Sequence, residues 1–245
     1  MKKFLNAIFV IVLASCAGEA NFDYTTKTDV QIYEEGLRQL KKENNISATE
    51  AFKQVEYNHP YSPFVAKSWI MAGYAYYKEK KYIDAIEQFE RLLKFQPNHP
   101  QADYSMYMIA MSYYDQISPI TRDQKMTEMS LLKMQELEKK YPDSKFTNDV
   151  KPKIIIARNN LAAKEMYIAS TLIEKKNIIA ALNRYQTVIK KYETTLFVPE
   201  AIFRTVEIYN IMGDKDEVKN MTRLLEVNYP KTKWYKMAKE IADAI

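Results

Sequence analysis

The chain has 245 residues, with 36 lysines and arginines against 31 aspartates and glutamates, which gives a formal net charge of +5 at pH 7. Basic and acidic residues are interleaved, a pattern typical of solvated helix faces that argues against a nucleic-acid-binding stripe. Four glycines, nine prolines and long runs rich in Leu, Ile, Lys, Glu, Tyr and Met favour a nearly all-helical chain. The single cysteine has no possible disulfide partner within the chain.

Residues 1–15 have the pattern of a secretory signal peptide. Lys2 and Lys3 precede an apolar run from Phe4 to Ala14, and small residues follow. Eleven helical residues span only about 16 Å, against about 30 Å for a hydrocarbon core, so we do not expect a permanent transmembrane helix here. Removal of residues 1–15 takes away two lysines and no acid, and it lowers the net charge to +3.

Residues 13–16, LASC, resemble the bacterial lipobox, in which the cysteine is lipidated and becomes the first residue of the mature protein. We therefore predict a covalent lipid on Cys16. Each buried methylene of an acyl chain contributes about 0.8 kcal/mol, so several chains would hold the protein at a membrane. Ala17 stands where inner-membrane retention signals usually have Asp, which by resemblance favours the outer membrane. The alternative is an ordinary cleaved signal with an incidental cysteine.

Residues 16–28 are predicted to form a flexible lipidated tether that reaches at most about 40 Å. Beyond this tether, the segment WIMAGYAYYKEKKYIDAIEQFERLLKFQP matches the tetratricopeptide pattern of two antiparallel helices. Gly73 and Ala85 are small because the helices cross closely there, while Trp69 and Phe89 fill the surrounding space. The match predicts a helical repeat centred on this segment.

The same frame predicts five helix pairs in one superhelical solenoid over residues 29–245. The pairs are expected near 29–62, 66–99, 103–143, 162–195 and 199–232, followed by an amphipathic capping helix at 233–245. The third pair fits if about eight extra residues, within QISPITRDQ, lengthen the turn between its helices. Because a single repeat cannot bury its apolar face alone, the five pairs are expected to form one all-α domain.

Catalytic and metal-binding chemistry has little support. His59 and His99 are the only histidines, each directly before a proline, and we expect both in solvent-facing turns. With one cysteine and two histidines, neither a structural zinc site nor a Ser/His/Asp triad is expected. The glycines are too widely spaced for a phosphate-binding loop. We predict no catalytic residue, no metal, no cofactor beyond the lipid, and a non-enzymatic function.

The first helix of each repeat is expected to line a concave groove with its positions 2, 5, 9 and 12. In the first three repeats half of these positions are tyrosines: Tyr33, Tyr74, Tyr77, Tyr104, Tyr107 and Tyr114. Tyrosine combines an apolar ring with a hydrogen-bonding tip and loses little entropy on binding, which suits capture of an extended peptide with aromatic side chains. The alternative is that these rings pack between neighbouring repeats.

Several stretches resemble the BamD family, also called ComL, of outer-membrane lipoproteins. The resemblance covers nearly the whole mature chain, and it rests on the lipobox, on GYAYYKEKKYIDAIEQFERLLKFQPNHPQADYSMYMIAMSYY, on ELEKKYPDSKFTND and on AALNRYQTVIKKYETT. Ala110 and Glu193 depart from the family pattern, where glycine and proline are usual. The resemblance implies an accessory of the β-barrel assembly machinery whose N-terminal repeats recognise unfolded outer-membrane proteins.

The resemblance further implies that C-terminal repeats dock on the periplasmic domains of BamA, with other Bam subunits as partners. Arg184 matches a family arginine associated with that docking, although an arginine here could equally pair with a nearby acid. The expected location is the outer membrane, lipid-anchored on the periplasmic side, without a nucleic-acid partner. The alternative is another periplasmic tetratricopeptide lipoprotein scaffold, serving the Tol or cell-division apparatus or recruiting a cell-wall enzyme.

Overall fold

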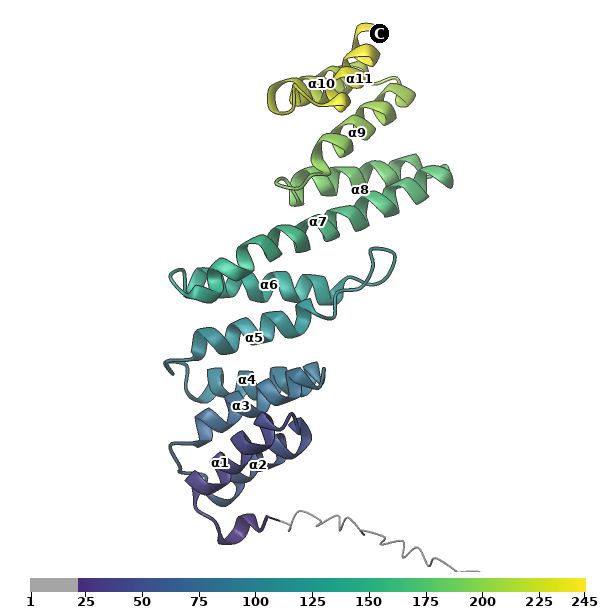
Figure 1. Cartoon of the computed structure of the whole chain (residues 1–245). Coiled ribbons are helices and arrows are strands. Elements are labelled where there is room, and N and C mark those ends of the chain that lie inside the picture. The colour runs from purple at the N-terminus through teal and green to yellow at the C-terminus, as the bar shows by residue number, and fades with distance from the viewer. Residues whose placement is uncertain (1–21) are drawn as a thin grey trace, which may run out of the picture.

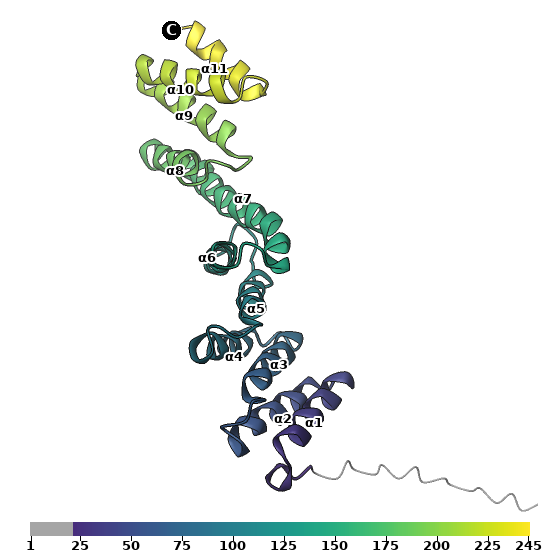
Figure 2. The same cartoon turned by 90° about the vertical axis from the view of Figure 1, so that its left-hand side faces the viewer.

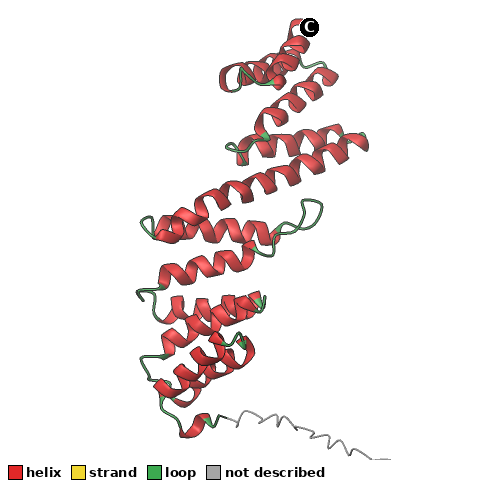
Figure 3. Cartoon of the chain, viewed as in Figure 1, coloured by secondary structure: helices red, strands yellow, loops and turns green. Residues whose placement is uncertain are grey.

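The computed structural model describes residues 22–245, in which it contains eleven α-helices, one short 3₁₀-helix and no strand (Figure 3). In chain order the elements are η1 (Tyr24–Thr26), α1 (Asp29–Lys41), α2 (Asn45–Asn58), α3 (Val65–Lys78), α4 (Tyr82–Phe95), α5 (Ala102–Tyr114), α6 (Lys125–Lys140), α7 (Lys145–Glu174), α8 (Ile178–Lys191), α9 (Val198–Met212), α10 (Lys215–Asn228) and α11 (Lys233–Asp243). The predicted signal peptide and Cys16 lie outside the described residues.

The helices form an elongated stack in which the chain advances steadily from one end to the other (Figures 1 and 2). Each helix packs mainly against the helices directly before and after it in the sequence. The buried core follows the same order as a series of local clusters. Such nearest-neighbour packing defines a solenoid. The predicted all-α tetratricopeptide solenoid of about five helix pairs is confirmed.

Glycine permits the close helix crossings of the first two pairs. Gly36 of α1 faces the ring of Phe52 of α2, and a Cβ at this position would lie 2.5 Å from that ring. Gly73 of α3 faces Phe89 of α4 in the same way, at 2.9 Å. Both phenylalanines are almost completely buried. The aromatic ring therefore occupies the space that a side chain on the opposite helix would need.

The turn between the two helices of a pair has a recurrent geometry. Glu43, Lys80 and Lys176 adopt positive φ angles of 59°, 57° and 59°, and Gly213 adopts 78° at the corresponding point after α9. A left-handed residue at this place ends the first helix and allows the chain to reverse. Only Gly213 does so without a Cβ penalty. The third pair differs because residues 115–124 lengthen its turn, and there the buried Gln124 side chain donates hydrogen bonds to three loop carbonyls.

Helix α7 is much longer than the repeat frame predicts. The first helix of the fourth pair, expected to start near residue 162, is the C-terminal part of a 30-residue helix. Its N-terminal part packs on α6 and α5 and buries Val150, Ile154 and Ala157 along one face. Pro152 stands inside this helix on the exposed side, where the carbonyl that loses its helical partner can be solvated.

The two ends of the solenoid are closed differently. Residues 22–28, expected to be part of a flexible tether, are instead folded back: Asp23 caps η1 and η1 contacts α2. The Nε2 atom of His59 lies 2.9 Å from the carbonyl oxygen of Lys27, which fixes the same segment. At the other end, α11 packs on α9 and α10, with the Trp234 ring 5.4 Å from that of Phe203. This packing covers the apolar face of the last pair.

Candidate functional site

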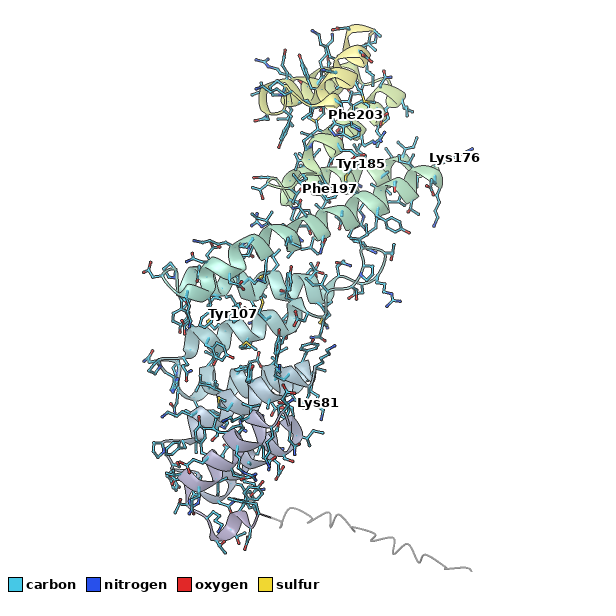
Figure 4. The ribbon with its side chains drawn as sticks, in the orientation of Figure 1. Lys81, Tyr107, Lys176, Tyr185, Phe197 and Phe203 are labelled. Atoms are coloured by element: carbon cyan, nitrogen blue, oxygen red, sulfur yellow. The ribbon has the colours of Figure 1, made fainter. Side chains whose placement is uncertain are left out.

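The six predicted groove tyrosines lie on the first helices of three successive pairs, and all six are half-buried. Tyr33 belongs to α1, Tyr74 and Tyr77 to α3, and the other three to α5. Figure 4 labels Tyr107 on α5, the last of these three helices. Because helices α1, α3 and α5 occupy equivalent places in the stack, the rings follow one another along the solenoid. We call this set the tyrosine groove, after the groove that the repeat positions predict.

Each end of the tyrosine groove includes ring contacts between successive repeats. The Tyr33 ring lies 5.6 Å from Phe52 of its own pair and 5.1 Å from Phe64, which precedes α3. The Tyr107 ring stacks on Phe146 of α7, with centroids 4.8 Å apart and planes 25° apart. Tilted and offset aromatic pairs of this kind add about 0.5–1.5 kcal/mol beyond their burial. Phenylalanine rings of neighbouring segments therefore hold the rings of Tyr33 and Tyr107 in place.

Tyr104 packs against two phenylalanines from different helices. Its ring lies 6.1 Å from Phe89 and 5.4 Å from Phe146, so it joins the second pair to α7. Burial raises the pKa of Tyr104 to about 12. This residue fits the alternative from the sequence, in which a ring packs between repeats, better than it fits direct peptide contact. Tyr74 and Tyr114 pack against the neighbouring core clusters without a ring pair of their own.

Two of the hydroxyl groups donate to carboxylates across the helix stack. The Tyr77 hydroxyl donates to Asp115 Oδ2 at 2.5 Å, and the Tyr107 hydroxyl donates to Asp149 Oδ2 at 3.0 Å. Burial, and then the hydrogen bond to Asp115, raises the pKa of Tyr77 well above its usual range. Burial and the bond to Asp149 raise the pKa of Tyr107 to about 12. Both phenols therefore remain neutral and oriented at physiological pH.

Sequence reasoning missed Phe146 and Asp149 because the repeat frame left residues 144–161 outside any pair. Both residues come from the N-terminal part of α7. The signal that could have found them is the helical spacing of Phe146, Val150 and Ile154, which continues one apolar face into the fourth pair. Asp149 accepts from Lys153 of its own helix at 2.8 Å and from the hydroxyl of Tyr107 of α5. Its carboxylate therefore links α5 to α7.

Cations lie beside the aromatic surface. The Lys67 ammonium lies 5.3 Å from the Phe64 ring centroid, and the Lys145 ammonium lies 5.0 Å from that of Phe146. At these distances a cation is attracted by the ring quadrupole, and both lysines are exposed. The tyrosine groove therefore combines half-exposed phenol rings, two acceptor carboxylates and two flanking ammonium groups.

The predicted docking residue Arg184 lies on α8, far along the stack from the tyrosine groove. Its Nη1 donates to Glu165 Oε2 of α7 at 3.0 Å. The arginine side chain is 46% exposed and that of Glu165 only 16% exposed. The pairing with a nearby acid is thus present, and it leaves nearly half of the arginine accessible to a partner.

The histidines differ from expectation. Both His59 and His99 are half-buried, and each makes a local contact: His59 with the carbonyl of Lys27, and His99 through Nδ1, which accepts from the backbone N–H of Gln101. Burial lowers the pKa of His99. Within residues 22–245 no cluster of three potential metal ligands occurs. The same residues include no helix that is both long and apolar enough to cross a membrane.

The geometry defines a class of protein: a tetratricopeptide-type helical solenoid. The chain belongs to the YfiO family, described as outer membrane lipoprotein, whose model matches residues 25–224. The predicted resemblance to the BamD family is confirmed, because several relatives aligned over most of the chain carry the name outer membrane protein assembly factor BamD.

Two of these relatives illustrate the similarity. The protein of Caulobacter vibrioides is 34% identical over 226 residues, which cover 91% of this chain and 74% of that protein. The protein of Rickettsia prowazekii is 33% identical over 240 residues, which cover 97% of this chain and 96% of that protein. Among solved structures, the tetratricopeptide domain of P58(IPK) aligns with 88% of this chain and 65% of its own, at 14% identity and a TM-score of 0.45.

Proposed function

We propose that this chain is a non-enzymatic, lipid-anchored subunit of the β-barrel assembly machinery, which binds unfolded outer-membrane proteins and the BamA subunit and promotes folding and insertion into the outer membrane. Membership of a family described as outer membrane lipoprotein supports the location. The name of the relatives supports the process. The solenoid acts through protein–protein contact alone, and other Bam subunits are further partners.

The proposed anchor is a lipid on Cys16, which becomes the first residue after residues 1–15 are removed. The lipid holds the chain at the periplasmic side of the outer membrane. The lipobox-like LASC supports this proposal. Replacement of Cys16 by serine should abolish incorporation of labelled palmitate and remove the protein from the outer-membrane fraction. Continued presence of the unlabelled variant in the outer-membrane fraction would show that another feature holds the protein there.

The observation that carries client binding is the tyrosine groove. Its rings are half-exposed, yet aromatic neighbours and hydrogen bonds to Asp115 and Asp149 hold them in place. A rigid aromatic surface loses little conformational entropy when a peptide binds. Lys67 and Lys145 lie beside this surface and complement a carboxylate. The proposed ligand is an extended peptide that ends in an aromatic residue.

The test is peptide binding by a triple variant. Replacing Tyr74, Tyr77 and Tyr107 by alanine should weaken binding of a fluorescent peptide with a C-terminal phenylalanine by about tenfold or more, because aromatic anchors dominate such interfaces. The matched control replaces the exposed Tyr57 and Tyr61 by alanine and should leave affinity unchanged. Circular dichroism confirms that each variant is folded. Equal affinity of the triple variant and the control removes the tyrosine groove from the mechanism.

The proposed contact with BamA uses Arg184. Reversal to glutamate places a carboxylate beside Glu165 and should release BamA from the complex in a pull-down. Glu165→Gln is the control, because it removes the intramolecular partner while leaving the arginine charge for BamA. Retention of BamA by the Arg184→Glu variant would assign Arg184 to intramolecular pairing only.

A further inference from the structure

A second groove lies in the C-terminal half of the solenoid, between α7 and α9. It encloses about 710 Å³. Tyr185 of α8 and Phe197, directly before α9, line it, and Figure 4 labels both where α8 and α9 meet. Ile120, which comes from the lengthened turn of the third pair, lines it as well. We call this the α7–α9 groove.

The α7–α9 groove uses the same helix positions as the tyrosine groove. Positions 2, 5, 9 and 12 of the fourth repeat all line it: Ala163, Met166, Ser170 and Ile173. Positions 2 and 9 of the fifth repeat, Glu200 and Glu207, line it as well. The concave positions therefore change from tyrosine to aliphatic and acidic residues between the third and fourth pairs.

The groove is acidic although the chain as a whole is basic. Glu174, Glu200 and Glu207 line it together with a single cation, Arg204, so three negative charges stand against one positive. Arg204 Nη1 donates to Glu207 Oε2 at 2.8 Å, and Nη2 donates to Glu200 Oε1 at 3.4 Å. Its guanidinium also lies 5.6 Å from the Trp234 ring. Arg204 thus orients two carboxylates and leaves a net charge of −2 in a chain of formal net charge +5.

Large apolar side chains around the groove remain exposed. Tyr167 is 43% exposed, Ile211 is 69% exposed, and the adjacent Met212 is 50% exposed. Single exposed apolar residues are common, but a group of them around an apolar hollow marks an interaction surface. A ligand that covers these side chains as well as the hollow is larger than one that fills the hollow alone.

We propose that the α7–α9 groove binds an amphipathic helix of a partner protein, with aliphatic side chains on one face and lysine or arginine along the edge. The acidic lining selects the basic edge. The lining of α7 runs from Ala163 to Glu174, about 16 Å or three helical turns, which matches a helix that inserts residues at i, i+4, i+7 and i+11. The inference goes beyond the proposed function, since it uses neither the tyrosine groove nor Arg184.

The test measures fluorescence anisotropy of labelled model peptides with the full chain in zwitterionic lipid nanodiscs, after subtraction of the signal from empty nanodiscs. The basic probe is a 14-residue helix with leucines on one face and lysines at its edge. A second probe has glutamate for every lysine, and a third has a central proline. Because the whole chain carries a positive net charge, non-specific electrostatics would favour the glutamate probe. We expect the basic probe to bind about tenfold or more tightly than either other probe.

Two variants locate the binding. The charge variant, Glu174→Lys with Glu207→Gln, should lower the affinity for the basic probe by about tenfold and raise the affinity for the glutamate probe. The apolar variant, Tyr167→Ala with Ile211→Ala, should lower the affinity for the basic probe by a similar factor. The matched control, Tyr57→Ala with Ile83→Ala, removes exposed side chains elsewhere and should change nothing.

Three results would overturn the proposal. The first is no binding of the basic probe at concentrations up to about 1 mM. The second is equal binding of the basic and glutamate probes, or unchanged affinity in both groove variants. The third is equal binding of the proline probe, which would exclude a helix as the occupant. The Tyr74, Tyr77 and Tyr107 triple variant should bind the basic probe normally, so failure of the proposed function and failure of this inference are distinguishable.

Discussion

Replacement of Gly36 by alanine tests whether the α1–α2 crossing is as tight as the structure indicates. In an exposed helix, glycine to alanine stabilises by up to about 1 kcal/mol. Here the new Cβ would lie 2.5, 2.7 and 2.8 Å from three ring atoms of Phe52. That ring is 1% exposed and cannot retreat into solvent. Overpacking of a core typically costs about 1–3 kcal/mol, so we expect a net loss of up to about 2 kcal/mol.

The measurement is hydrogen exchange of the α1 and α2 amides, because repeats of a solenoid need not unfold in one transition. The Gly36→Ala, Phe52→Leu double variant should lose less amide protection than the two single variants lose in sum, since the smaller leucine side chain makes room for the new Cβ. Gly213→Ala is the control: no heavy atom lies within 4 Å of its Cβ, and only its positive φ opposes the change. Increased protection of α1 and α2 in the Gly36→Ala variant would refute the reasoning.

Three further predictions follow from the backbone and the tyrosines. Lys80→Gly should stabilise the second pair by about 0.5–1 kcal/mol in amide hydrogen exchange, because φ is positive there, whereas Lys78→Gly at the last residue of α3 should destabilise it. Pro152→Ala should increase amide protection in α7 by about 1–3 kcal/mol, since it supplies the missing helical N–H. The pKa of Tyr107 is raised to about 12 from 10.0, so its contribution to stability is complete below pH 10 and is lost between pH 10 and about 12. Unfolding free energies measured over this range should fall less steeply for Tyr107→Phe, and identical slopes would contradict the assignment.

The helices and their pairing could be predicted from the sequence because a solenoid is local. Apart from the packing of α11 on α9, every major packing contact joins a helix to the next one along the chain, so one repeat period contains both partners. In the second pair, the repeat pattern already contains the small residue Gly73 and the ring of Phe89, which meet where α3 and α4 cross. The αL turns at Glu43, Lys80 and Lys176 carry no glycine and left no comparable signal, yet the packing of the flanking helices imposes the same conformation.

The candidate site could be predicted only in part. Helix periodicity placed the six tyrosines on the first helices of three pairs, where the structure also has them. Their partners were not predictable, because Phe146 and Asp149 come from the part of α7 that lies between two repeats of the frame. Nor did the spacing indicate that residues 22–28 fold against α2, since a short polar segment carries no periodic signal.

The sequence by itself determined that this chain is helical, that its helices pair in a repeat, and that Gly73 stands at the helix crossing of the second pair. Only the tertiary structure decided that α7 is continuous, that the hydroxyls of Tyr77 and Tyr107 meet carboxylates of later segments, and that Ile120 reaches a groove between α7 and α9. The reason is physical. Periodicity encodes the contacts inside one helix pair, whereas contacts on the concave surface depend on the angle between successive pairs, which results from the packing of many side chains at once.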